Sequence, residues 1–185
     1  MRVIAGTWRG RVIAAPPGNA TRPTADRTRE ALFSMLLSRI DSFEGLRVAD
    51  LFAGSGALGI EALSRGAAHC LFVEQDAAAI ATLRANLARL GAVGEVRATS
   101  VMALGPAPAP LDVVMMDPPY RSGAGAVALD RLARLGWIGL ATWISVETAA
   151  TEEVNVAGFN TNASRRHGKA RITLLQRAAP DGGQI

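Results

Sequence analysis

Residues 48–59 read Val-Ala-Asp-Leu-Phe-Ala-Gly-Ser-Gly-Ala-Leu-Gly. The first five residues are typical of a buried strand, and Gly54, Gly56 and Gly59 follow it in the spacing G-x-G-x-x-G. Glycines at a strand-to-helix turn let the backbone approach a nucleotide-like ligand closely. The stretch predicts a βαβ unit with a cofactor at its first turn, although a tight turn with close helix packing would need the same glycines.

Two carboxylates accompany the glycine turn. Glu74 ends the next predicted strand, 20 residues after Gly54, which is the spacing of a group that binds ribose hydroxyls. Asp50 precedes the glycines at the strand end, where its carboxylate could hold a cationic amine. S-adenosylmethionine has such an ammonium group, whereas NAD would place there a pyrophosphate that the carboxylate repels. The pair therefore favours S-adenosylmethionine over NAD.

A second strand end carries Asp117-Pro118-Pro119-Tyr120, directly after the apolar run 111–116. The Asp117 carboxylate and the Pro118 carbonyl could accept both hydrogens of an exocyclic amine and point its lone pair at a methyl sulfonium. The prolines stiffen the turn, and Tyr120 offers a ring face to a base removed from its stack. The alternative is a plain Pro-Pro turn with Asp117 as a helix cap.

Apolar runs alternate with helical patterns through most of the chain. We expect strands at 46–52, 69–75, 94–98, 111–117 and 140–147, and helices at 26–40, 57–65, 77–90 and 126–136. This alternation predicts an α/β protein with a parallel, doubly wound sheet. The first of these helices should start at a cap formed by Thr24 or Asp26.

The two ends of the chain differ from this pattern. Strands at 152–157 and 170–177 have no helix between them, so they should pair antiparallel through the polar stretch 158–169. Residues 2–5 and 10–15 predict a β-hairpin. We therefore divide the chain into an N-terminal hairpin and basic arm at 1–25, a main domain at 26–179, and a disordered tail at 180–185.

Composition restricts the class of protein. The chain has 185 residues, 49% of them hydrophobic, and its one cysteine, Cys70, excludes an internal disulfide. We expect a reducing, cytoplasmic location, because a lone buried thiol fits that compartment and the N-terminus lacks a signal peptide. No apolar run reaches the roughly 20 residues of a membrane span. His69 and His167 stand apart in the sequence, so we expect no metal site.

The positive charge is concentrated at the N-terminus. Residues 1–29 contain six arginines against Asp26 alone, whereas the rest of the chain has 14 basic and 15 acidic side chains. Such a segment predicts contact with a polyanion, although a solvated basic arm is the alternative. Trp8 lies among these arginines and could stack on an unpaired base or pack in a core. Arg165–Lys169 is a second basic loop, either a solvated turn or a further polyanion contact.

The sequence resembles the RsmD-type bacterial methyltransferases, which methylate the N2 amine of a guanine in 16S, small-subunit ribosomal RNA. The likeness covers nearly the whole chain and includes the blocks Arg2–Arg11, Arg22–Glu30, Asp50–Ala67, Phe72–Glu74, Asp117–Tyr120 and Val146–Glu147. Asp-Pro-Pro-Tyr alone is shared with DNA amino-methyltransferases and protein glutamine methyltransferases. The Arg-Pro-Thr block and the long glycine block are much more specific.

The resemblance implies a class I, Rossmann-like methyltransferase fold, with a mostly parallel sheet and a reversed final strand. It implies that S-adenosylmethionine is the cofactor and that 16S RNA or the small ribosomal subunit is the partner of a monomeric enzyme. The residues that it assigns to the cofactor are Asp50, Ala53, Gly54, Ser55, Gly56, Glu74 and Ser100. The catalytic residues are Asp117, Pro118 and Tyr120. The RNA-binding residues are Trp8, Arg9, Arg11, Arg22 and Arg27.

Two other functions stay open at this point. One is a DNA adenine or cytosine amino-methyltransferase, although 185 residues leave no room for a separate DNA-recognition domain. The other is a non-catalytic RNA-binding factor of ribosome assembly, whose Rossmann-like core keeps only its ligand-binding ability.

Overall fold

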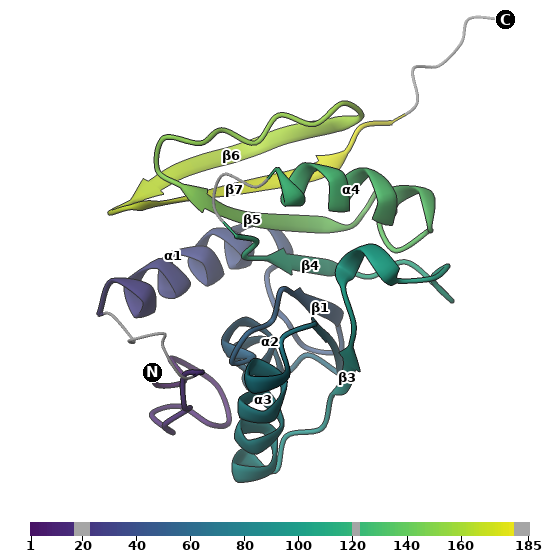
Figure 1. Ribbon diagram of the computed structural model, residues 1–185. Helices are drawn as coiled ribbons and strands as arrows, with labels where there is room; N and C mark the ends of the chain where they lie inside the picture. The colour runs from purple at the N-terminus through teal and green to yellow at the C-terminus, as the bar shows by residue number, and fades with distance from the viewer. Residues whose placement is uncertain (17–22, 120–122, 180–185) are drawn as a thin grey trace, which may run out of the picture.

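Seven strands form one mixed sheet in the order β3-β2-β1-β4-β5-β7-β6, shown in Figure 1. The computed structural model describes residues 1–16, 23–119 and 123–179. The strands are β1 (Arg47–Leu51), β2 (His69–Glu74), β3 (Glu95–Ala98), β4 (Val113–Met116), β5 (Trp143–Ala149), β6 (Phe159–His167) and β7 (Ala170–Arg177). Strands β1 to β5 run parallel, and β7 is antiparallel to both of its neighbours. The predicted sheet with a reversed final strand is therefore confirmed.

Helices cover both faces of the sheet. They are α1 (Pro23–Ile40), α2 (Ala57–Ser64), α3 (Ala77–Leu90) and α4 (Ala124–Arg134). Strand β4 shows how both faces are buried, because Val113 and Met115 pack with α1, α2 and α3, while Val114 and Met116 pack with α4. A strand covered on both faces is apolar along its whole length, which is why the run before Asp117 does not alternate.

The predicted helices agree with the observed ones to within a few residues, and α1 shows the most informative difference. It starts at Pro23 instead of residue 26. Proline fits the first turn of a helix, where its missing N–H group would have no partner in any case. Asp26 consequently lies inside the first turn, where its carboxylate pairs with Arg29 at 3.1 Å.

The strand predicted at 152–157 is wrong. Residues 152–156 have no regular structure, and the strand that pairs with β7 is β6, Phe159–His167, in the stretch predicted to be a connection. Strand β6 lies at the edge of the sheet and most of its residues are exposed. An edge strand can therefore be polar, because its exposed side chains are solvated. Its polar residues, such as Asn160, Asn162 and Arg166, are also common in turns, so the sequence pattern predicted a connection here.

The N-terminal hairpin is present as antiparallel contacts around a single bridge between Arg2 and Val12. Its arms are not regular strands, because the N–H groups of Ile4 and Ala5 donate to the Glu61 carboxylate of α2, at 2.8 and 3.0 Å. Val3 and Ile13 are buried in the same core as α1. Residues 1–16 thus pack as part of the main body.

Several predictions concern residues that the structure does not describe, namely Arg22, Tyr120 and the tail at 180–185. Among the residues it does describe, no helix combines the length and the hydropathy needed to cross a membrane. No group of three or more histidine, cysteine or acidic side chains within those residues could hold a metal ion.

Candidate cofactor and substrate site

Four carboxylates meet at one edge of the sheet. Asp50 is the next-to-last residue of β1, Glu74 ends β2, Asp117 follows β4, and Glu147 is near the end of β5. These four strands are parallel and in register, with Asp50 beside Met115 and Met116 beside Val146. Their carboxyl ends therefore lie at a common edge, which is where ligands bind in open α/β sheets. We call it the carboxyl edge.

The three glycines of the first turn have different tasks. Gly54 has a φ angle of +53°, and a Cβ added there would meet nothing within 4 Å. An added Cβ at Gly56 would meet the Cδ1 atom of Leu83 at 2.2 Å, and one at Gly59 would meet the Phe72 ring at 2.3 Å. Gly54 thus leaves open space for a ligand, while Gly56 and Gly59 allow close packing of the turn and of α2.

Glu74 holds the glycine turn as well as ending its strand. One carboxylate oxygen accepts the N–H of Gly54 at 2.8 Å, and the other accepts those of Gln75 and Asp76 at 2.7 and 2.9 Å. A carboxylate has about four acceptor positions, so about one is left for a hydroxyl group of a ligand. Glu74 is therefore placed to fix the turn and to contact a ribose at the same time.

Asp50 is almost completely buried, with 1% of its surface exposed. Its Oδ2 atom accepts the N–H of Gly59, in the first turn of α2, at 2.8 Å. Burial raises the pKa of Asp50 to about 8, against the lowering effect of that hydrogen bond, and the nearby Asp117 and Glu74 carboxylates add to the rise. Without a ligand, the site therefore favours a protonated Asp50 at neutral pH, and a cation bound beside it would favour the ionised form.

A small hollow of about 20 Å³ lies next to the glycine turn, between the ends of β1, β2 and β3. Phe52, Glu74 and Ser100 are among its lining residues. Phe52 has a φ angle of +62°, a conformation that costs a non-glycine residue about 1–3 kcal/mol and is concentrated at ligand sites. Ser100 caps the turn Val101–Ala103 by accepting the N–H of Met102 at 3.2 Å, which leaves its hydroxyl hydrogen for another acceptor.

Ala53 and Ser55, the other predicted cofactor contacts, are both buried. The N–H of Ala53 donates to the Val73 carbonyl at 3.1 Å, and the Ser55 carbonyl accepts the side-chain amide of Asn86 at 3.0 Å. These two contacts tie the turn to β2 and to α3. The other backbone groups of both residues and the Ser55 hydroxyl are not used in these contacts.

Asp117 and Glu147 form the second half of the site. Met116 is paired with Val146, so the next residues, Asp117 and Glu147, are neighbours on adjacent strands. Asp117 is exposed to solvent on one side and surrounded by protein atoms on the others. This crowding raises its pKa to about 7, and the negative charge of Glu147 contributes to the rise. The pair can hold hydrogen-bond donors and accept a proton near neutral pH.

A larger hollow of about 120 Å³ adjoins the Asp-Pro-Pro turn on the α4 side. Pro118 and Pro119 form one wall, the start of α4 forms another, and Val146, Thr148 and residues 152–155 close it. A Cβ at Gly125 would come within 3.3 Å of the Pro118 ring, so glycine lets α4 begin close to the turn. Space therefore exists beside the Pro118-Pro119 turn that follows Asp117.

Two of the predicted RNA-binding residues, Trp8 and Arg11, lie away from this edge. The N–H of Trp8 donates to the Ser64 hydroxyl at 3.0 Å, and an Arg11 amine donates to the Arg89 carbonyl at 3.2 Å. Ser64 and Arg89 are at the carboxyl ends of α2 and α3, where these helices lead back to the starts of β2 and β3. Trp8 is half-buried, whereas Arg9, Arg11 and Arg27 are exposed.

Three residues that matter at the site received no role from sequence reasoning. Phe52 has no sequence signal, because its positive φ angle is visible only in the structure. Glu147 could have been found from its place at the end of an apolar run, as Asp117 was. Asn86 is 1% exposed and joins Ala14 to Ser55, and a polar residue on the buried face of α3 was the available signal.

The fold and this edge define a class I methyltransferase. The model of the family described as conserved hypothetical protein 95 matches residues 1–176. Ribosomal RNA small subunit methyltransferase D of Escherichia coli K12 is 37% identical over 183 residues, which cover 97% of this chain and 91% of that protein. Its counterpart in Haemophilus influenzae is 38% identical, over 80% of this chain and 78% of that protein.

Solved structures agree with these relatives. The structure of yhhF from Escherichia coli, described as a methyltransferase, superposes with a TM-score of 0.84 at 36% identity and covers 97% of this chain and 99% of that one. Magnesium protoporphyrin IX methyltransferase from Synechocystis with bound S-adenosylmethionine shares the fold at 16% identity, with a TM-score of 0.66 over 87% of each chain. The chain belongs to the RsmD-type methyltransferase family, as predicted, and its cofactor is S-adenosylmethionine.

Proposed function

We propose that this protein methylates the exocyclic N2 amine of a guanine in small-subunit ribosomal RNA. The observation that carries the proposal is that a place for the cofactor and a place for an amine lie at the same edge of the sheet. The open glycine turn beside Asp50 and Glu74 suits the cofactor. Asp117 follows β4, and only β1 lies between β4 and the strand that ends at Glu74, β2. The relatives named as ribosomal RNA methyltransferases support the RNA substrate.

The N2 amine of guanine is a weak nucleophile, because its lone pair is delocalised into the ring. When bound, S-adenosylmethionine supplies a methyl group on a positively charged sulfur, which is already a strong electrophile. The contribution of Asp117 and the Pro118 carbonyl would be to accept the two amine hydrogens and so hold the lone pair in line with that methyl group. Tyr120, which lies outside the described residues, would stack on the base.

The reaction forms one nitrogen–carbon bond, breaks one sulfur–carbon bond and releases one proton from the amine. A carboxylate with a pKa near 7 can take that proton at neutral pH, and Asp117 has this property because of its crowded surroundings and Glu147. Asp117 would thus orient the amine first and receive its proton afterwards.

The test is methyl transfer to small ribosomal subunits that lack the modification, and to 16S RNA stripped of protein, with the product nucleoside identified by mass spectrometry. N2-methylguanosine in either substrate supports the proposal and decides between assembled and naked RNA. A methylated adenine or cytosine would replace the guanine assignment, and methylation of duplex DNA alone would establish the DNA methyltransferase. If the protein binds the subunits but transfers no methyl group, it acts as a binding factor.

A further inference from the structure

The turn between β6 and β7 lies at the same sheet edge as the reaction site. Strand β7 is antiparallel to β5, with Ala149 paired with Ala170, and the Ala150 N–H donates to the Lys169 carbonyl at 2.9 Å. Ala149 is the last residue of β5, at the carboxyl edge. The hairpin tip, Arg165–Lys169, therefore stands at the edge that contains Asp117 and Glu147. Figure 1 shows the tip at the left, where β6 ends and β7 begins.

A cross-strand row connects the tip to the catalytic carboxylate. Arg165 is paired with Ile172, and Ile172 is paired with Glu147, the neighbour of Asp117. Paired residues project to the same face, and strands are about 4.8 Å apart, so three spacings place Arg165 about 14 Å from Asp117. Arg166 is paired with Arg171 and projects to the other face. A strand of RNA with one base at Asp117 would have its neighbouring phosphates at this range.

The cations of the tip are exposed. Arg165, Arg166 and Lys169 are accessible to solvent, and no side-chain hydrogen bond or ion pair to another described residue engages them. Arg171, one strand inward, is by contrast held by the Ser164 hydroxyl, the Ala150 carbonyl and Glu153. The tip itself contains no acidic residue. Three exposed positive charges therefore lie close together at the end of the β6–β7 hairpin, where they can bind phosphate groups.

The tip is also held in a defined position. His167 is paired with Ala170, which leaves Gly168 and Lys169 as a two-residue turn. Gly168 has a φ angle of +61°, which glycine adopts without strain. The hairpin continues the central sheet through the pairing of β7 with β5. Little conformational freedom of the backbone would be lost when it contacts a ligand.

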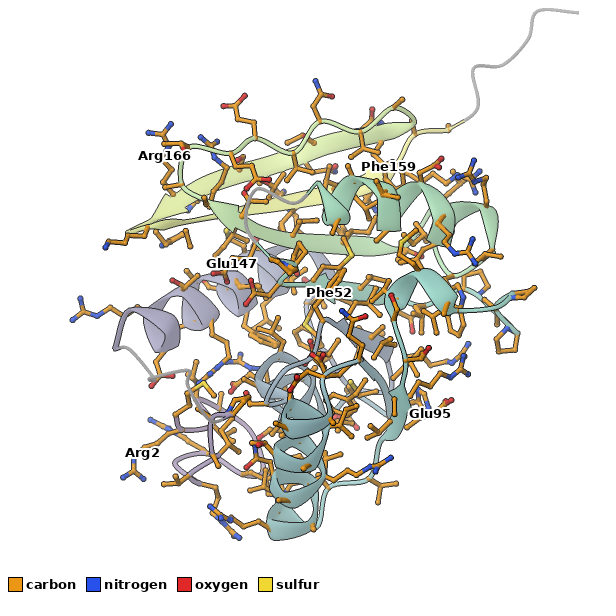
Figure 2. The ribbon with its side chains drawn as sticks, in the orientation of Figure 1. Arg2, Phe52, Glu95, Glu147, Phe159 and Arg166 are labelled. Carbon is orange, nitrogen blue, oxygen red and sulfur yellow. The ribbon has the colours of Figure 1, made fainter. Side chains whose placement is uncertain are left out.

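We propose that the hairpin tip, through Arg165, Arg166 and Lys169, binds the phosphates of the RNA strand on one side of the target base. This inference rests on the proposed RNA substrate. It differs from the expectation for the N-terminal segment, because Trp8 and Arg11 contact the carboxyl ends of α2 and α3, away from the reaction edge. Figure 2 shows Arg166 at the upper left and Arg2 at the lower left, on separate parts of the molecule.

The experiment compares two matched double variants, Arg165→Gln with Arg166→Gln at the tip and Arg9→Gln with Arg11→Gln in the N-terminal segment. Binding to small ribosomal subunits lacking the modification is measured by filter retention across a salt series. Each phosphate contact on single-stranded RNA contributes about 0.7 to the salt slope, so the tip variant should lose about 1.4 units of slope and roughly tenfold in affinity near 0.15 M salt. The affinity for S-adenosylmethionine, measured by calorimetry, should stay unchanged in both.

The outcomes separate this inference from the proposed function. A tip variant that binds subunits with the wild-type affinity and slope overturns the inference, even if the wild type forms N2-methylguanosine. A larger loss in the N-terminal variant than in the tip variant also overturns it and returns the RNA surface to residues 1–16. If the wild type binds subunits but does not methylate guanine, the proposed function fails while the binding comparison still decides the role of the tip. Unchanged urea unfolding of both variants verifies that neither effect comes from misfolding.

Discussion

The N-terminal segment, residues 1–16, and the hairpin tip are both rich in arginine, and they use arginine differently. In the N-terminal segment, Arg2 donates to the Gly10 carbonyl and Arg11 to the Arg89 carbonyl, at 2.9 and 3.2 Å. At the tip, Arg165 and Arg166 have exposed side chains with no such partner among the described residues. A count of charges along the sequence therefore cannot separate cations that hold the fold from cations that face a ligand.

Glu61 explains why the N-terminal segment is part of the fold. It is 1% exposed, accepts the N–H groups of Ile4 and Ala5, and pairs with Arg65 at 2.8 Å. Arg29, one of the six N-terminal arginines, is also buried and lies 3.9 Å from the same carboxylate. The positive charge of Arg29 thus compensates a buried carboxylate and is shielded from solvent.

The largest expected effect comes from removing Glu61, which tests whether residues 1–16 are part of the fold. Glu61→Ala leaves the N–H groups of Ile4 and Ala5 and the half-buried Arg65 without their carboxylate partner. Breaking a buried pair in this way costs about 3–5 kcal/mol of unfolding free energy. Urea denaturation measures the loss, and hydrogen exchange in residues 1–16 should increase with it. The tip variant Arg165→Gln with Arg166→Gln should stay within about 0.5 kcal/mol of the wild type, as surface changes do. A Glu61→Ala protein as stable as the wild type would mean that the segment is a dispensable arm.

A second prediction tests whether methyl transfer takes place at the carboxyl edge. Asp117→Ala should reduce single-turnover methyl transfer by about 100-fold or more, the usual cost of removing a preorganised hydrogen-bonding group from an active site. Its affinity for S-adenosylmethionine should remain close to that of the wild type. Asp117→Asn keeps one acceptor oxygen, so it should lose less.

Trp8→Ala is the matching change near the ends of α2 and α3. Because the half-buried Trp8 side chain packs against the core, we expect a lower stability with a near-normal single-turnover rate at saturating RNA. Equal rates for Asp117→Ala and the wild type would show that the reaction site has been placed at the wrong strand end.

The third prediction concerns the cofactor half of the carboxyl edge. Glu74→Ala removes the acceptor of the Gly54 N–H and the proposed ribose contact. Losing a hydrogen bond to a charged group costs about 1.5–3 kcal/mol, which corresponds to roughly 10- to 150-fold weaker binding. Calorimetry with S-adenosylmethionine measures it, and the hairpin-tip double variant is the control with unchanged affinity. If Glu74→Ala bound S-adenosylmethionine with the wild-type affinity, Glu74 would hold the glycine turn but would not contact the cofactor.

The smallest expected effect is a shift in pH dependence. The pKa of Asp117 is raised to about 7, first by its crowded surroundings and then by Glu147. Its ionised form accepts the amine hydrogens, so kcat/KM should rise with pH through about 7. The charge of Glu147 favours the protonated form of Asp117. Glu147→Gln should therefore lower the pKa of Asp117 and move this rise to lower pH. An unshifted profile would mean that Asp117 does not control it.

Much of the site could be predicted from local sequence. The strand ends at Asp50 and Asp117 follow from apolar runs that stop at glycine and at proline, and the end at Glu74 follows from a run that stops at the polar pair Gln75-Asp76. Helix α3 was predicted at its observed bounds, Ala77–Leu90. The prediction failed at β6, because an exposed edge strand has no apolar pattern to distinguish it from a loop. It also could not foresee that Glu61 is buried, since its partners Ile4 and Ala5 are 57 and 56 residues away in the chain.

The sequence by itself determined the class of protein and the identity of its cofactor turn. Glycine spacing, apolar runs and strand-ending carboxylates are properties of a few neighbouring residues, so they are readable without any fold. Only the tertiary structure decided which arginines are exposed, that the tip Arg165–Lys169 shares an edge with Asp117, and that Trp8 and Arg11 do not. The physical reason is that exposure and adjacency are set by contacts between segments far apart in the chain. Those contacts depend on how the whole sheet is paired.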